Sequence, residues 1–176
     1  MKPSQKPPTW PNDIYEVFKE VDIRQVCYVP DAGHTHLINA CNANKRMQTI
    51  SLTTEEEGVA MLAGTWLGGE RGALLLQSSG VGNCINLLSI MNECRFPLLM
   101  LVTMRGEWGE FNPWQLAMGQ GTPPALQNAG VVVQRVDRAK DVREFVFAAA
   151  QLTFNTSRPV ALLISQRIIG FKDWSK

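Results

Sequence analysis

The stretch Gly72–Asn83 reads GALLLQSSGVGN, a run of apolar residues followed directly by small residues and glycines. The apolar half, Gly72–Gln77, lacks the alternation of a strand with one wet face, so it predicts a strand buried on both faces. The half from Ser78 to Asn83 is typical of a tight turn that leads into a helix. A buried strand, a short turn and a helix form the unit from which open parallel sheets are built.

The same unit recurs on both sides of this stretch. Apolar runs predict further strands at Gln25–Pro30, Met47–Leu52, Pro97–Met104, Val131–Val136 and Pro159–Gln166. Helical periodicity predicts helices near Asp13–Val21, Thr35–Asn44, Thr54–Gly68, Val81–Cys94 and Ala139–Asn155. We therefore expect an α/β fold with a doubly wound, mostly parallel six-stranded sheet and helices on both faces. Ligands on such sheets bind at the carboxyl ends of the strands, which selects Asp31–His36, Thr53–Glu57, Ser78–Asn83 and Arg105–Thr122.

The 176 residues suffice for one sizeable core and predict an N-terminal tail over 1–12 and a single domain over 13–176. The net charge of +1 and the scattered basic residues give no field that would attract nucleic acid or an anionic membrane. The polar N-terminus lacks a secretory pattern and no apolar run is long enough to span a bilayer, which predicts a cytoplasmic protein. The four cysteines have no metal-type spacing, so we expect buried free thiols and no metal site.

Three consecutive glutamates, Glu55 to Glu57, follow the second predicted strand. Their simplest interpretation is structural, with Thr54 as the helix N-cap and Glu57 completing a capping box. A helical wheel places Glu55 and Glu56 at the two edges of the buried stripe and turns Glu57 away from it. Periodicity thus leaves Glu55 and Glu56 open as inward-facing carboxyl groups, which need a partner or must stay protonated. Such groups are frequent at functional sites.

Two segments at the same predicted edge of the sheet have open interpretations. The glycine stretch fails the GxGxxG fingerprint because Ile85 occupies the third glycine position, although its glycines suit a close approach of backbone to a planar ligand. The segment Arg105–Thr122 is long for a loop in a compact domain and holds two tryptophans, which indicates a functional loop or an interface. Arg105 suits a sulfonate, phosphonate or carboxylate, or an ion pair with Glu107 or Glu110.

The strings TTEEEGVAMLAGTWLGGERGALLLQSSGVGN (53–83) and RGEWGEFNPWQLAMGQGTPPAL (105–126) carry a family resemblance. Together they resemble the pyrimidine-binding subunit of sulfopyruvate decarboxylase and the corresponding domain of phosphonopyruvate decarboxylase, over nearly the whole chain. The resemblance implies a thiamine-diphosphate-binding fold of the pyrimidine-binding (PYR) type. The family has a glutamate followed nine residues later by a glycine, and counting back from Gly64 selects Glu55.

The resemblance implies that Glu55 hydrogen-bonds N1′ of the aminopyrimidine of thiamine diphosphate. The tautomer favoured in this way takes the proton from C2 of the thiazolium ring, which then attacks a 2-oxo acid and accepts the electrons released with CO2. By the same resemblance, the residues that line or shape the cofactor site are Gln77, Ser78, Ser79, Gly80 and Gly82.

The loop Pro30–His36 faces the substrate in this superfamily, so the resemblance implies roles for Asp31, His34 and Arg105 in substrate binding. His34 is also a candidate proton donor or acceptor, with a loop histidine or helix cap as the alternative. Asp31 either takes part in the site, pairs with a histidine or caps the next helix. The Asp-Ala-Gly-His form departs from the family's usual small or polar residues, which leaves the substrate open.

In the family a second domain with a GDG motif and a downstream Asn holds the diphosphate through Mg2+, and this sequence contains no GDG. The resemblance therefore implies a partner subunit that binds Mg2+, in a hetero-oligomer with at least two copies of each chain. The expected activity is non-oxidative decarboxylation of a sulfopyruvate- or phosphonopyruvate-type 2-oxo acid. The alternatives are a carboligase subunit of acyloin or acetolactate type, a catalytically silent regulatory subunit, and a flavodoxin-like flavin or nucleotide binder.

Overall fold

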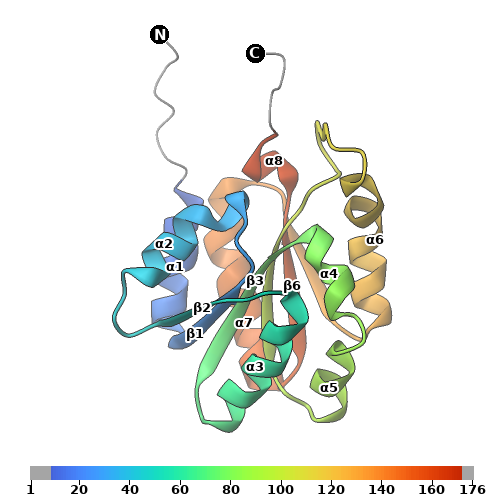
Figure 1. Cartoon of the computed structure of the whole chain (residues 1–176). Helices are drawn as coiled ribbons and strands as arrows, with labels where there is room; N and C mark the ends of the chain where they lie inside the picture. Colours follow the sequence, from blue (N-terminus) through green and yellow to red (C-terminus); the bar gives the residue numbers. More distant parts are fainter. Residues whose placement is uncertain (1–8, 172–176) are drawn as a thin grey trace.

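A six-stranded sheet, in which every strand pair is parallel, forms the centre of the computed structural model, which describes residues 9–171 (Figure 1). The strand order is β2-β1-β3-β4-β6-β5. This confirms the predicted doubly wound sheet. The strands are β1 (Ile23–Tyr28), β2 (Gln48–Ser51), β3 (Arg71–Gln77), β4 (Leu98–Thr103), β5 (Val132–Val136) and β6 (Pro159–Ile164).

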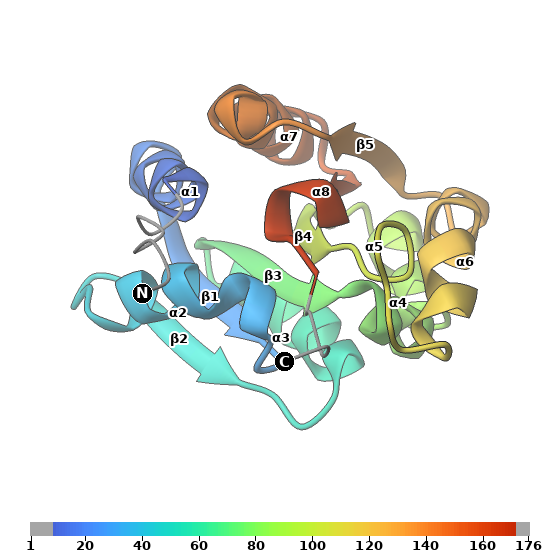
Figure 2. The ribbon, with the colours of Figure 1, turned by 90° about the horizontal axis from the view of Figure 1, so that it is seen from above.

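Helices cover both faces of the sheet (Figure 2). The core on one face is formed with α1 (Trp10–Glu20), α2 (Thr35–Asn42) and α7 (Val142–Thr156). The core on the other face is formed with α3 (Glu55–Leu67), α4 (Ser78–Cys84), α5 (Leu88–Glu93) and α6 (Gln115–Asn128). The short helix α8 (Gln166–Ile169) follows β6, and two 3-10 turns, η1 (Ala32–His34) and η2 (Ala139–Asp141), precede α2 and α7.

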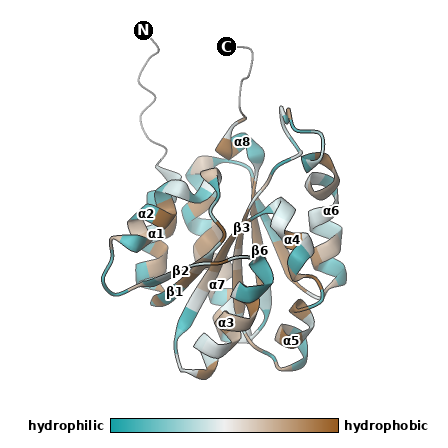
Figure 3. Cartoon of the chain, viewed as in Figure 1, coloured by the Kyte–Doolittle hydropathy of each residue, from teal (hydrophilic) through white to brown (hydrophobic). Residues whose placement is uncertain are grey.

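The central strand β4 explains why the apolar runs show no alternation. Its residues Leu99 and Leu101 join the core under α1 and α7, whereas Leu98, Met100 and Val102 join the core under α3 to α6. Both faces of the strand are therefore buried, and the apolar colouring of Figure 3 is concentrated in the sheet. Within residues 9–171, no helix is long and apolar enough to cross a membrane.

The helix α6 is the main departure from the sequence-based expectation, because Arg105–Thr122 was expected to be a loop. The helix begins at Gln115 and contains Pro123 and Pro124 in its interior. Its two prolines and two glycines are disfavoured in a helix, so residue propensities did not predict a helix here. Gly119 has a packing role, since a Cβ there would lie 2.5 Å from the carbonyl oxygen of Arg105.

Several boundaries also differ from the predicted ones. The glycine stretch is not a turn, because helix α4 begins at Ser78, directly after β3. The predicted helix Val81–Cys94 is divided into α4 and α5. Helix α1 begins at Trp10, inside the predicted tail 1–12. Residues 1–8 of that tail and 172–176 of the predicted domain lie outside the described residues.

Three of the four cysteines are buried, as predicted. Burial raises the pKa of the thiols, to about 11 for Cys27 and about 12 for Cys41 and Cys84. Cys94 is exposed, so the prediction of a buried thiol is wrong there. It lies just after the end of the short helix α5, where the chain turns toward β4.

Candidate active site

The segments selected from the sequence meet at one edge of the sheet, because all six strands run in the same direction. Asp31 follows β1, Glu55 follows β2, Ser78 follows β3 and Arg105 follows β4. The segment after Arg105 and helix α8 stand together at this end of the molecule (Figure 1). This is the edge at which open parallel sheets bind their ligands.

Glu55 is the first residue of α3, and only 8% of its surface is exposed. Glu56 is only partly buried, so of the two glutamates that the helical wheel left open, Glu55 is the inward-facing one. Glu57 is exposed. Glu57 caps the start of the helix through its Oε2, which accepts a hydrogen bond from the backbone N–H of Thr53 at 2.9 Å. The side chain of Thr54 makes no cap hydrogen bond, so the expected capping box does not form.

Helix α4 frames the carboxylate of Glu55. Nδ2 of Asn83 donates a hydrogen bond to Oε2 of Glu55 at 2.7 Å. A Cβ at position 80 would lie 2.1 Å from Oε1 of Glu55, so only glycine allows α4 to approach the carboxylate this closely. Sequence reasoning assigned Asn83 to the start of a helix and missed this contact, because residues 55 and 83 meet only through the fold.

The second carboxylate oxygen of Glu55, Oε1, lies beside Gly80 of α4. No hydrogen bond from the described residues reaches Oε1, and the residue retains 8% exposure. A largely buried carboxylate with one oxygen fixed and the other without a hydrogen-bond partner suits a hydrogen bond with a ring nitrogen of a planar heterocycle. The residues present therefore fit an aminopyrimidine.

Asp31 is the centre of a second polar cluster at the same edge. Its Oδ1 accepts a hydrogen bond from Nε2 of Gln77 at 2.9 Å, and its Oδ2 accepts one from Oγ1 of Thr103 at 2.6 Å. Oε1 of Gln77 in turn accepts hydrogen bonds from Ser79 and Gln115. Asp31 thus pairs with neither histidine, and Thr103 and Gln115 join the site although the sequence did not single them out.

Ser78 connects α4 to the two segments beside it. The side chain is buried, and its Oγ accepts a hydrogen bond from the backbone N–H of Arg105 at 3.0 Å. Its carbonyl oxygen accepts a hydrogen bond from Thr122 of α6. The hydroxyl of Ser78 therefore joins the start of α4 to the residue that follows β4. Ser79, in contrast, is exposed at the rim.

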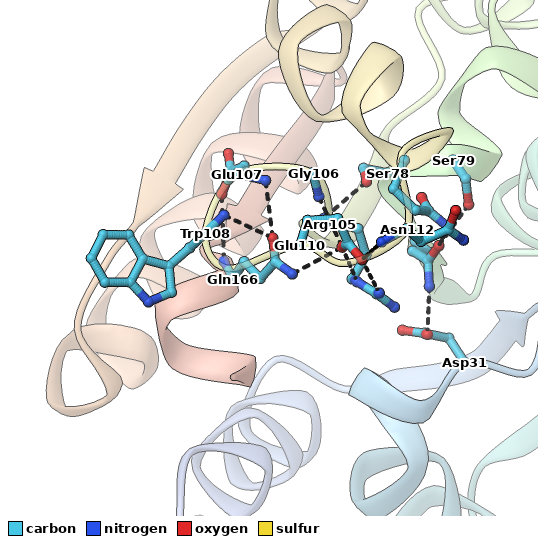
Figure 4. Close-up of polar contacts among 12 residues, drawn as sticks. Asp31, Ser78, Ser79, Arg105, Gly106, Glu107, Trp108, Glu110, Asn112 and Gln166 are labelled. Atoms are coloured by element: carbon cyan, nitrogen blue, oxygen red, sulfur yellow. Dashed lines mark hydrogen bonds and ion pairs between the residues drawn. The ribbon is translucent and has the colours of Figure 1, made fainter. Parts of the chain in front are cut away.

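Arg105 is paired with Glu110, which is one of the two ion pairs considered from the sequence. Its Nε and Nη2 donate to the two carboxylate oxygens at 2.7 and 2.6 Å, and the Glu110 side chain is only 2% exposed (Figure 4). Glu110 also accepts hydrogen bonds from the N–H groups of Gly106 and Asn112 and from the amide of Gln166. Chiefly the bond from Arg105 lowers the pKa of Glu110 to about 2.

A hollow of about 160 Å³ lies between these two polar clusters. One wall carries Asp31 and Thr103, and Arg105 stands beside them. Another wall is formed by Ile169, the last residue of α8, and by Gly170 and Phe171 after it. The predicted substrate residues Asp31 and Arg105 thus line one cavity at the carboxyl edge of the sheet.

His34 lies away from this solvent-facing rim. It is fully buried, and its Nε2 hydrogen-bonds to the carbonyl oxygen of Leu101 in β4 at 3.0 Å. Burial lowers the pKa of the imidazole, and the nearby charge of Asp31 opposes that shift only in part. The neutral ring therefore anchors η1 to the sheet, while His36 on α2 is exposed.

Within the described part of the chain, no group of three or more His, Cys, Asp or Glu side chains is arranged to hold a metal ion.

Comparisons with known proteins identify the family of the chain. Residues 9–110 match the family described as thiamine pyrophosphate enzyme, N-terminal TPP binding domain. The chain is 32% identical to the sulfopyruvate decarboxylase subunit alpha of Methanococcus maripaludis, over 86% of this chain and 91% of that protein. It is 30% identical to the phosphonopyruvate decarboxylase of Streptomyces viridochromogenes, over 90% of this chain but 41% of that protein.

A solved structure supports the fold. The chain superposes with a TM-score of 0.71 and 15% identity on a 2-oxoglutarate:ferredoxin oxidoreductase from Magnetococcus marinus. The match covers 91% of this chain and 29% of that one. With the family match and the relatives above, the chain belongs to the thiamine pyrophosphate enzymes, through their N-terminal TPP-binding domain, in the branch of the sulfopyruvate and phosphonopyruvate decarboxylases.

Proposed function

We propose that this chain is one subunit of a two-chain, thiamine-diphosphate-dependent decarboxylase of 2-oxo acids, and that Glu55 activates the cofactor. The observation that carries the proposal is the carboxylate of Glu55, held by Asn83 through one oxygen and without a hydrogen bond from the described residues at the other. When bound, thiamine diphosphate supplies a nucleophilic carbon that attacks the ketone and accepts the electron pair released with CO2.

The role of this chain is to hold and orient the aminopyrimidine. Glu55 shares a proton with the ring nitrogen, and Asn83 prevents the carboxylate from rotating away. Gly80 allows the backbone to come close, Gly82 is exposed on the same helix beside Met118 of α6, and Gln77 and Ser79 close the rim. Ser78 acts in this proposal by fixing α4, and His34 by fixing η1, without contact with the reacting atoms.

The outer face of α3 is the surface that we propose for binding the partner subunit. Ala60, Met61, Gly64 and Leu67 are exposed there, and Leu67 keeps 73% of its surface in solvent. Among the described residues nothing lies within 4 Å of a Cβ built on Gly64, so a helix of another chain can approach closely. The relatives of matching length are named alpha subunits. We propose that the partner holds the diphosphate through Mg2+.

A second apolar surface extends the proposed interface. The segment after β4 exposes three aromatic side chains, Trp108, Phe111 and Trp114, the last with 80% of its surface in solvent. Large aromatic groups on a rigid segment are typical anchors in protein interfaces. This segment stands at the same end of the sheet as Glu55, so one partner can cover both.

The hollow between Asp31 and Arg105 is the proposed substrate site. Because Arg105 shares its charge with Glu110, the described residues that line the hollow offer an anion only the remaining edge of one guanidinium group. The names of the relatives point to sulfopyruvate or phosphonopyruvate. A doubly charged substrate of this kind would take further cationic groups from the partner.

The replacement Glu55→Gln tests the proposal. In the complex with the partner, Mg2+ and thiamine diphosphate, we expect CO2 release to fall by about 100-fold or more, because an amide cannot exchange the proton. The matched control is Glu57→Gln, two residues further along the chain at an exposed position, and it should release CO2 at the wild-type rate. An undiminished rate in Glu55→Gln would contradict the catalytic role and favour a silent subunit. Analysis for acyloins and acetolactate separates decarboxylation from carboligation.

A further inference from the structure

Gln166, the first residue of α8, is fully buried, and its side-chain hydrogen bonds to the described residues all go to the segment 105–112. Its Oε1 accepts hydrogen bonds from the backbone N–H groups of Glu107 and Trp108, at 2.9 and 3.0 Å. Its Nε2 donates to Oε2 of Glu110 at 3.0 Å. Figure 4 shows the amide between these groups, on the inner side of the segment. One side chain therefore holds three successive parts of the segment 105–112.

The bond to Glu110 extends this contact to the hollow. Glu110 binds Arg105 through both carboxylate oxygens, and Arg105 lines the hollow beside Asp31. The helix that begins at Gln166 leads directly to Ile169 and Phe171, on the other wall. The amide of Gln166 thus connects the two walls of one cavity through hydrogen bonds and the backbone.

A space-filling role does not account for these contacts. A leucine would occupy a similar volume, but it would leave the N–H groups of Glu107 and Trp108 without their acceptor and would remove one of the five hydrogen bonds to Glu110. Buried polar groups of this kind need hydrogen bonds. The amide also matches the polarity of each contact, since it accepts from two donors and donates to one acceptor.

We propose that Gln166 is a positioning residue for the substrate site, which sets the placement of Arg105 through Glu110 and holds the segment 105–112 in its binding form. The inference rests on the proposed function in one respect, namely that the hollow receives the 2-oxo acid. Its direct consequence is that Gln166 governs substrate affinity and leaves the chemical step, which depends on Glu55, largely unchanged.

The isosteric variant Gln166→Glu tests the link to Glu110 selectively. It keeps an acceptor for Glu107 and Trp108 but replaces the donor to Glu110 with a second carboxylate. In the reconstituted complex we expect the KM for the 2-oxo acid to rise about tenfold or more, with kcat within about threefold of the wild type. The control Gln151→Glu makes the same change on the exposed face of α7, where Asn155 donates to the side chain. It should leave both constants unchanged.

The pH dependence separates positioning from general damage. The introduced carboxyl group would face Glu107 and Glu110, with Arg135 and Arg105 paired to them. Glu110 stays ionised because its pKa is about 2. As the pH falls toward about 5.5, the introduced group gains a proton and donates to Glu110 again, so the KM defect should shrink. A defect independent of pH, or a fall in kcat without a rise in KM, would overturn the proposal.

Amide hydrogen exchange provides a readout that needs no activity. The N–H groups of Glu107 and Trp108 should remain protected in Gln166→Glu and exchange faster in Gln166→Leu, which removes their acceptor. Equal protection of these N–H groups in the wild type and both variants would contradict the proposal that Gln166 holds the segment 105–112. If the wild-type complex releases no CO2, the proposed function fails while the exchange result still stands.

Discussion

At the scale of single residues, the site is defined by contacts between side chains far apart in the sequence. Helical periodicity placed Glu55 on an inward edge, and the glycine spacing of a family selected it over Glu56. Neither argument could find Asn83, Thr103 or Gln115, because each reaches its partner only after separate strands align at one edge. For the same reason the burial of His34 under β4 was invisible in the sequence.

The contact between Gly80 and Glu55 leads to a prediction at this scale. In Gly80→Ala the new Cβ would lie 2.1 Å from the carboxylate, so Glu55 must move. We expect the rate of the complex to fall by at least about tenfold and the free energy of unfolding to decrease by about 1–3 kcal/mol. Urea unfolding and CO2 release measure the two effects.

The control for this change is Gly121→Ala, in α6. Among the described residues nothing lies within 4 Å of a Cβ at that position. Alanine should raise the free energy of unfolding there by about 0.5–1 kcal/mol, as expected for a helix interior. If Gly80→Ala behaved in the same way, the close approach to Glu55 would not constrain the helix.

At the scale of elements, the strands and most helices followed from patterning, but the segment after β4 did not. Apolar runs identified all six strands, of which β4 and β6 are buried throughout, because a two-sided sheet leaves little room for polar side chains at its centre. The edge strands β2 and β5 are only partly buried. The sequence of α6 carries prolines and glycines and has little amphipathic period, so its helix depends on packing against Gly106 and Ser78. Local propensity contains no record of such tertiary contacts.

The same segment should show a characteristic acid sensitivity through Glu110. Its pKa in the folded protein is lowered from the ordinary value of 4.5 to about 2. Its ionised form therefore stabilises the fold fully above about pH 4.5, and that contribution is lost as the pH falls toward 2. At pH 7 we expect Glu110→Gln to lower the free energy of unfolding by about 1–3 kcal/mol, and the difference should vanish near pH 2.

Chemical denaturation at a series of pH values measures this effect. Glu144→Gln, at an exposed position in the first turn of α7, is the control and should show a much smaller difference at every pH. A constant difference between wild type and Glu110→Gln down to pH 2 would mean that the ionised carboxyl group of Glu110 stabilises the fold no more than the protonated one.

At the scale of the whole molecule, Glu55 and the exposed aromatic segment lie at the carboxyl end of the sheet, and α3 runs from that end along one face of the sheet toward the opposite end (Figure 1). The family resemblance anticipated a site completed by another chain, since the sequence contains no GDG motif. Which surfaces would meet that chain could not be inferred from composition, because exposed and buried apolar residues look alike in α3. Only the fold shows that Met61 and Leu67 lie outside the core.

This arrangement gives a prediction for assembly. In Gly64→Leu the added side chain points into open space, so the isolated chain should keep its stability. Binding of the partner, measured by titration calorimetry, should weaken by at least about tenfold, because a bulky group on a close-packed helix face forces the chains apart. Ala148→Leu places the same group on the exposed side of α7 and should leave binding unchanged. Equal affinities for both variants would exclude α3 from the interface.

The contact between α4 and Glu55 also limits how this protein can evolve. Every amino acid other than glycine brings a Cβ, so position 80 has no conservative exchange while a glutamate occupies position 55. A lineage that gains a side chain at position 80 while it keeps the glutamate must accept a new placement of the carboxylate. Substitutions at the two positions are therefore coupled, because a side chain at position 80 costs less once the one at position 55 is shorter.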